Sequence, residues 1–212
     1  MSEKTLQELL ENLADITGSE QKQIIVALVH RGQKIVPELI AYLEKTIDDK
    51  AKILLLSVLI KLQDKRCEDI FKQQLSAENE NVRSLSAQGL VAIHSSQALE
   101  ACIKTIDDAA DFAHGDVTPS VLSLANIGED VLLNTLPLLN NENSETRQHA
   151  QKVFELVSYN KVNNLYKPRA LSDVARHKWN ELWETNGAYH WGKPEQGRLL
   201  SMELWKRWIE SN

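Results

Sequence analysis

Histidine, cysteine and acidic side chains are the residues of this chain that could bind a metal ion or transfer protons. Its six histidines are scattered: none pairs with another at helical ligand spacing, and none directly precedes a glutamate (His30, His94, His114, His149, His177 and His190). A zinc-binding helix or a His-Glu iron site needs such spacing. Phosphate-loop, dinucleotide and nucleophile-elbow motifs are also missing from the sequence. We therefore expect no catalytic residue, no metal ion and no cofactor.

The densest acidic stretch is DDAADFAHGD, from Asp107 to Asp116. Four aspartates beside His114 suggest a metal site, but they lack the regular alternation and the closing glutamate of a calcium loop. A solvated connection that caps the neighbouring helices explains the stretch more simply.

The elements that would position any site are helices, and the clearest pair lies between Asn81 and Ile106. Apolar residues at Val82, Leu85, Leu90 and Ile93 line one face of a helix. A short polar turn at 94–96 follows, and then a second apolar stripe. Asn79 or Asn81 can cap the first helix. One such hairpin cannot bury both stripes, so copies of it are expected on either side.

Copies are found in register around five turn positions, each directly after the last core residue of a first helix: Gly32, Gln63, His94, Gly128 and Ser158. Their intervals are 31, 31, 34 and 30 residues. A further helix, Ser2–Thr17, covers the start of the array. The pattern predicts an all-α chain of about five helical hairpins.

The segments Val82–Ile103 and Leu124–Leu139 resemble HEAT repeats, of the short kind also grouped with phycobilin-lyase repeats. The shared features are the Val82-Arg83 pair, small residues on the first helix and Ile-Gly before the turn. The resemblance runs from about Gln21 to Val157 and implies a right-handed α–α superhelix, or solenoid, with function in its exposed surface. The arginine recurs at Arg147 and is replaced elsewhere by Gln21, Lys52 and Val117.

The pattern changes near the C-terminus. Residues 158–169 interrupt the repeats, so the second helix there is expected to be weak or short. A helix capped by Ser172 and a final helix from about Ser201 follow. We predict a repeat solenoid over residues 1–160 and a tryptophan-rich helical cap over residues 161–212, forming one domain overall.

All five tryptophans lie in the predicted cap: Trp179, Trp183, Trp191, Trp205 and Trp208. Four of them fall on helical stripes with Leu or Ile, which favours a seal over the last repeat. The alternative is a recognition surface in which Trp191, expected to be the most exposed, acts with Arg176 and Arg207.

The charge is divided unevenly along the chain. Residues 1–160 carry 15 Lys and Arg against 24 Asp and Glu, whereas residues 161–212 carry 9 against 6. An acidic body disfavours nucleic acid and attracts basic proteins. The interpretation is a non-catalytic scaffold, such as an inhibitor or immunity-type protein. The alternative is an enzyme or lyase subunit, similar to bilin lyases or HEAT-like DNA glycosylases, that uses the tryptophan-rich end.

In HEAT-like stacks the second helices line the concave side. The sixth and tenth residues after the turn positions should therefore contact the partner: Glu38, Tyr42, Asp69, Gln73, Glu100, Lys104 and Asn134. In the third hairpin, matching the core pairs would place Ala101 rather than Glu100 at the sixth position.

Cys67 and Cys102 fall on core stripes and are expected to be reduced packing residues. The polar start is unlike a secretory signal, and the apolar run Ile53–Ile60 is too short to span a membrane. A cytoplasmic monomer is the resulting expectation.

Overall fold

The computed structural model describes residues 6–11, 19–109, 117–166 and 172–211, and every regular element in these ranges is helical. The all-α prediction is therefore confirmed for this part of the chain. Two compact units divide the chain, residues 1–108 and residues 109–212. None of the described helices is long and apolar enough to cross a lipid bilayer.

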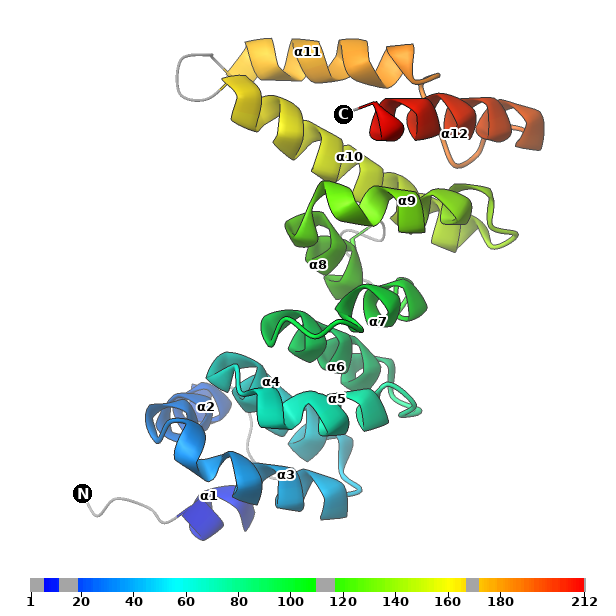
Figure 1. The fold of residues 1–212 in the computed structure, drawn as a ribbon. Coiled ribbons are helices and arrows are strands. Elements are labelled where there is room, and N and C mark those ends of the chain that lie inside the picture. The colour runs from blue at the N-terminus through cyan, green and yellow to red at the C-terminus, as the bar shows by residue number, and fades with distance from the viewer. Residues whose placement is uncertain (1–5, 12–18, 110–116, 167–171, 212) are drawn as a thin grey trace. The chain divides into compact units, whose positions relative to one another are not determined.

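Unit 1 contains hairpins that follow the short helix α1 (Leu6–Glu11). Their helices are α2 (Ser19–His30) with α3 (Val36–Lys45), α4 (Asp49–Leu62) with α5 (Glu68–Gln74), and α6 (Glu80–Ala92) with α7 (Ala98–Lys104). The first helices pack in chain order, α2 on α4 and α4 on α6, while α3 packs on α4 and α5 on α6 (Figure 1). Leucines on these helices, such as Leu55 and Leu59, are fully buried between them.

The turns of the hairpins share a residue with a positive φ angle. The turn positions Gly32, Gln63, His94 and Gly128 all have positive φ angles, of 72°, 49°, 54° and 98°. A left-handed residue ends a helix and reverses the chain. Four of the five turn positions predicted from the apolar pattern are thus turn residues in the structure.

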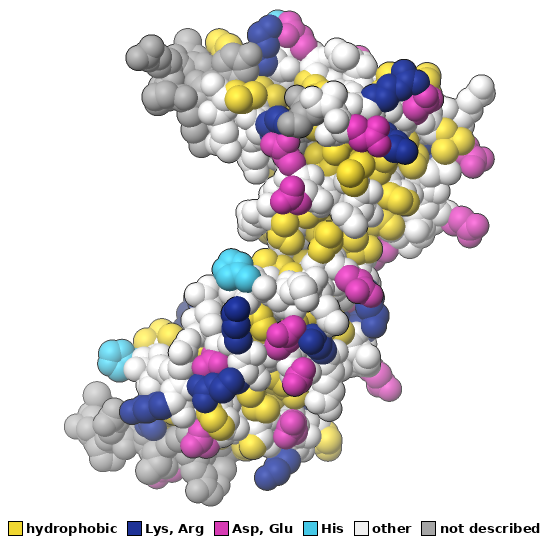
Figure 2. Space-filling model, viewed as in Figure 1, with side chains coloured by type: hydrophobic (Ala, Val, Ile, Leu, Met, Phe, Trp, Pro, Cys, Tyr) yellow, Lys and Arg dark blue, Asp and Glu magenta, His cyan; other side chains and the backbone are white. Residues whose placement is uncertain are grey.

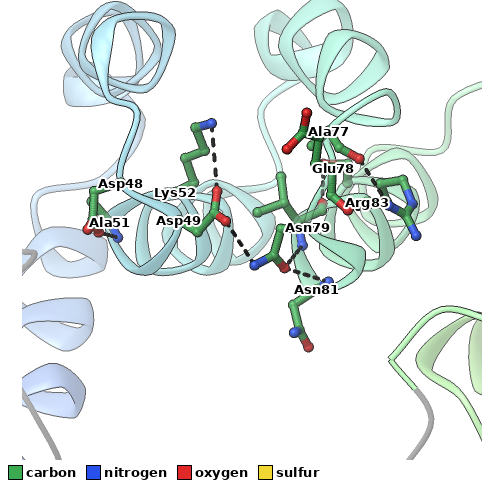
Figure 3. Close-up of polar contacts among 11 residues, drawn as sticks. Asp48, Asp49, Ala51, Lys52, Ala77, Glu78, Asn79, Asn81 and Arg83 are labelled. Atoms are coloured by element: carbon green, nitrogen blue, oxygen red, sulfur yellow. Dashed lines mark hydrogen bonds and ion pairs between the residues drawn. The ribbon is translucent and has the colours of Figure 1, made fainter.

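Polar side chains close the starts of the first helices. Asp48 caps α4 by accepting from the Ala51 amide at 2.8 Å, and Asn79, rather than Asn81, caps α6. Asn79 also donates its side-chain amide to Asp49 at 3.0 Å. Figure 3 shows how this bond ties the start of α6 to the start of α4.

An arginine four residues after the cap stabilises the preceding turn in both units. Arg83 Nη1 donates to the carbonyls of Ala77 and Glu78, at 3.0 and 2.7 Å (Figure 3). Arg147 Nη1 donates likewise to the carbonyls of Asn141 and Glu142, at 2.7 and 2.9 Å. The two local arrangements match, so the arginine has the same structural role at both places.

The register predicted for this arginine was wrong in one hairpin. Val117 lies before the cap of α8, which is Thr118, and the position four residues after the cap is Leu122. The mismatch arises because α8 has 9 residues whereas α6 has 13.

Helices α5 and α6 approach each other closely at Gly89. A Cβ atom built on Gly89 would lie 2.4 Å from Cε1 of Phe71, well inside van der Waals contact. The small residue expected on the first helix therefore leaves room for a fully buried aromatic ring.

Unit 2 contains one further hairpin and three longer helices. Its elements are α8 (Pro119–Ile127), the 3-10 turn η3 (Glu129–Val131), α9 (Leu132–Thr135), η4 (Leu136–Asn140), α10 (Ser144–Tyr166), α11 (Ser172–Thr185) and α12 (Glu195–Glu210). Helix α10 packs on α8, α9, η4 and α11, and α12 packs on α9 and η4 (Figure 1).

The structure corrects two expectations for this end of the chain. Residues 158–169 were expected to interrupt the repeats and to carry a weak or short second helix, yet α10 continues through Ser158 to Tyr166 as one helix. The Ser158 hydroxyl donates to the Phe154 carbonyl at 2.6 Å, so the helix satisfies it internally. The final helix begins at Glu195, directly after Pro194, instead of near Ser201. Residue 160, the predicted boundary between solenoid and cap, lies inside α10.

Candidate functional site

The predicted partner-binding residues of unit 1 lie on its second helices, α3, α5 and α7. All but one are exposed: Glu38, Asp69, Gln73, Glu100 and Lys104, with Tyr42 half-buried. The remaining predicted residue, Asn134, is exposed on α9 of unit 2. In Figure 1, α3, α5 and α7 follow one another within unit 1, and we call their exposed surface the second-helix face.

The ambiguity between Glu100 and Ala101 is settled by burial. Ala98, Ala101 and Cys102 are 8%, 3% and 0% exposed, which is the stripe of a helix packed on its neighbours. Glu100 therefore points to solvent. Each second helix of unit 1 consequently exposes a carboxylate at the sixth residue after its turn position.

Charges of both signs surround these carboxylates. Exposed or half-buried bases on the same segments are Lys34, Lys45, Lys65, Arg66, Lys72 and Lys104. Figure 2 shows acidic and basic side chains interspersed over α3 and α5. The second-helix face is therefore a mixed-charge surface.

Ion pairs hold several of these charges in place. Lys72 Nζ lies 3.0 Å from Glu68 Oε1 and 3.9 Å from Asp69 Oδ1. The hydrogen bond from the Lys72 ammonium keeps the pKa of Glu68 below its ordinary value, and the hydrogen bond from the Ser95 hydroxyl is the next largest cause. The Asp69 side chain is fully exposed in spite of this contact.

Hydrogen bonds join the turns of successive hairpins beside this face. Arg66 Nη2 donates to the Gln33 carbonyl at 2.8 Å, and Ser95 Oγ donates to Glu68 Oε1 at 2.9 Å. Arg66 also binds Asp64, and this hydrogen bond keeps the pKa of the carboxyl low. The second helices are thus fixed in order by contacts at their starts.

A small hollow opens between α5 and α7. It measures about 150 Å³ and is lined by Leu75, Gln97, Glu100, Ala101 and Lys104. Two predicted residues, Glu100 and Lys104, therefore line the same hollow.

The tryptophans of unit 2 form a chain of ring contacts. Trp205 is fully buried, with its ring 5.4 Å from Phe154, 5.2 Å from Trp183 and 5.3 Å from Trp208. Trp179 continues the chain, 5.4 Å from Trp183, and donates its Nε1 proton to Ser158 Oγ at 2.9 Å. The rings pack α10, α11 and α12 together.

The alternative recognition surface at this end would combine Trp191 with Arg176 and Arg207. Trp191 is half-buried, as are Trp179, Trp183 and Trp208. Its amide donates to Gln151 Oε1, its carbonyl accepts from Arg147, and His190 stacks on its ring. Arg176 and Arg207 are exposed, and Arg207 pairs with Glu203. No contact among the described residues joins either arginine to Trp191.

Residues with metal-binding or nucleophilic chemistry are spread apart. In the part of the chain that the structure describes, no three His, Cys, Asp or Glu side chains cluster as metal ligands do. His149 is buried, whereas His114 lies outside the described residues. Burial raises the pKa of Cys67 to about 11 and that of Cys102 to about 12, so both thiols stay protonated at neutral pH.

A second concave surface, in unit 2, was not predicted from the sequence. It combines amide side chains of α8 and α10, Asn126, Asn160 and Asn164, with the half-buried Trp208 of α12. The available signal was the asparagine-rich stretch at the end of α10, because asparagine is a weak helix former.

No family model matches this chain, and no curated protein or solved structure is significantly similar to it. Its function is therefore inferred from its own residues.

Proposed function

We propose that this protein is a non-catalytic binding module that takes a basic protein partner on its second-helix face. Its hairpins would form the right-handed superhelix that the HEAT resemblance implies. The observation that supports this most is the repeated exposure of one carboxylate per second helix, at Glu38, Asp69 and Glu100. The same helices bury their apolar stripes, so these positions serve no packing role.

The repeat architecture is supported by two recurring local features. Four turn positions are left-handed, and Arg83 and Arg147 bind the preceding turn in the same way. Repeats of this kind present equivalent side chains at regular spacing along one side. Such a row suits an elongated partner surface better than a small molecule.

The mixed charge of the face defines what the partner must supply. Basic side chains would pair with Glu38, Asp69 and Glu100, while acidic ones would meet the intervening lysines. Complementary patterns of this kind fix register and suppress wrong partners. An inhibitor or immunity-type protein, acting in a reducing cytoplasm that keeps Cys67 and Cys102 as thiols, would fit this arrangement.

The test is affinity capture from cells of the source organism, followed by quantitative mass spectrometry. A triple charge reversal, Glu38→Lys with Asp69→Lys and Glu100→Lys, is compared with the native chain. We expect the captured partner to be basic, and to bind the variant at least about tenfold more weakly and with less dependence on salt. Losing several rim charges acts mainly on the association rate.

A matched control reverses three exposed carboxylates outside the second helices: Glu20→Lys on α2, Glu80→Lys on α6 and Glu78→Lys in the connection before α6. This control should retain the partner, and the thermal midpoints of all three proteins should be similar. A partner captured equally by the native chain and the second-helix variant would disprove the proposal.

A further inference from the structure

Two adjoining hollows in unit 2 lie outside the second-helix face of unit 1. The first, of about 250 Å³, opens between the end of α8 and α10 and is lined by Asn126, Gly128, Asn160 and Asn164 among others. The second, of about 320 Å³, opens between α9 and α12 and is lined by Asp130, Leu132, Leu133, Trp208 and Ile209. Glu129 lines both hollows, so they share a wall.

Lys161 connects the two hollows. Its ammonium donates to Glu129 Oε2 and lies 4.9 Å from the centre of the Trp208 ring. This side chain is largely covered, with 19% exposed, so the pair is a fixed part of the wall. We call the combined surface the Asn–Trp groove.

The amide end of the groove consists of asparagines, which have low helix propensity. Asn160 and Asn164 stand one turn apart on α10, and both are exposed, as is Asn126 on α8. Asparagine is among the weaker helix formers. None of the three side chains makes a hydrogen bond to another described residue, so local structure does not account for them. Each offers one acceptor and two donor protons to a ligand.

The other end of the groove is apolar with an acidic rim. Leu133 is 48% exposed, and Trp208 and Ile209 are half-buried. Asp130 and Glu129 are exposed beside them. Of these two carboxylates, Glu129 is the one that pairs with Lys161. Figure 2 shows hydrophobic side chains gathered over α9 on this face of unit 2.

We infer that the Asn–Trp groove binds an extended polypeptide segment that carries an aliphatic or aromatic residue next to a basic one. The asparagine amides pair with the peptide groups of the segment, which present the same donors and acceptors. The apolar side chain enters the hollow beside Leu133 and Ile209. The basic side chain reaches Asp130, whose carboxylate completes the charge match.

Other ligand chemistries fit the groove less well. A sugar ring would stack on an open aromatic face, but Lys161 covers one face of Trp208 and Trp205 stands edge-on to it at 5.3 Å. Nucleic acid would bring phosphates against Glu129 and Asp130. A peptide satisfies the amide, apolar and acidic parts together.

The experiment selects short linear peptides from a phage-displayed library on the full-length chain. We expect an enriched consensus of an apolar residue flanked by Lys or Arg. A synthetic consensus peptide, measured by fluorescence polarisation, should bind the double variant Asn160→Ala with Asn164→Ala at least about tenfold more weakly. Alanine is the better helix former, so the thermal midpoint of that variant should equal or exceed that of the native chain.

A matched pair of variants tests the apolar end. Leu133→Asp should abolish peptide binding. Leu199→Asp, on α12 outside the groove and of nearly the same exposure (47% against 48%), should leave binding unchanged. Three results would overturn the inference. They are a selection without a consensus, a consensus peptide that binds every variant equally, and glycan-array binding that depends on Asn160 and Asn164.

Discussion

Tyr189 links the loop after α11 to η4 through one buried hydroxyl. The hydroxyl donates to the Leu139 carbonyl at 2.6 Å, and the residue is 2% exposed. Burial raises the pKa of Tyr189 to about 12 because the phenolate would lose its hydration. The neutral side chain therefore stabilises the folded state across the ordinary pH range.

The substitution Tyr189→Phe should lower the free energy of unfolding by about 1–3 kcal/mol, because the Leu139 carbonyl loses its donor. The folded pKa exceeds the unfolded value of about 10. The contribution of Tyr189 is thus complete below pH about 10 and is lost as the pH rises through about 12. Urea denaturation of both proteins from neutral to alkaline pH measures this. Equal stability and identical alkaline profiles would contradict the role given to the hydroxyl.

The sequence could predict the burial of single residues where they fall on the apolar stripe of a helix. Cys67 and Cys102 were placed on apolar stripes, and both are fully buried. The one-residue ambiguity at Glu100 could not be settled in this way, because both alignments of α7 preserve a plausible stripe. Burial of Ala101 against its neighbours decides it, and that depends on tertiary packing.

At the scale of elements, the apolar pattern located the first four turns but not the fifth. Left-handed residues end α2, α4, α6 and α8 at the predicted positions. Ser158 occupies the fifth position, yet its hydroxyl bonds back to Phe154 and also accepts from Trp179. Ser158 is therefore held inside α10 by its own helix and also contacts α11, which is distant in sequence. No local pattern could reveal that contact.

Phe71 packs directly against Gly89, where α5 and α6 are in close contact. Gly89→Ala should destabilise the chain by about 1–3 kcal/mol, although alanine favours helices, because its Cβ would overlap the Phe71 ring. Thermal and urea unfolding, followed by circular dichroism, measure the loss.

A second substitution serves as the control for Gly89→Ala. Phe71→Leu removes the ring atoms nearest to the new Cβ, so the two substitutions should be less destabilising together than the sum of the singles. Additive effects, or a stabilising Gly89→Ala, would show that α5 and α6 are not in close contact at this position.

At the scale of the whole molecule, the chain consists of two compact units with different ways of burying their apolar surface. Unit 1 repeats one hairpin, with leucines between the helices. Unit 2 relies on large aromatic rings that pack α10 against α11 and α12. The sequence signalled this difference through the location of the tryptophans, but it did not place the boundary between the compact units at residue 108.

Truncation after Tyr166 removes α11, α12 and all five tryptophans. The remaining chain would expose Phe154 and the apolar side of α10, which these rings cover. Each buried ring contributes about 1.5–3 kcal/mol or more, so we expect unit 2 to unfold or the fragment to aggregate. Size-exclusion chromatography and circular dichroism check this. A stable, monomeric fragment would instead indicate that the aromatic segment is dispensable for folding.

The placement of the aromatic rings also gives the molecule a built-in optical label. Every indole belongs to unit 2, and unit 1 contains none. Tryptophan emission therefore reports the melting of one half of the chain, whereas far-ultraviolet circular dichroism reports the helices of both. Superimposable transitions from the two signals would mean that the halves unfold cooperatively, and separate transitions would give the stability of each half in the intact protein.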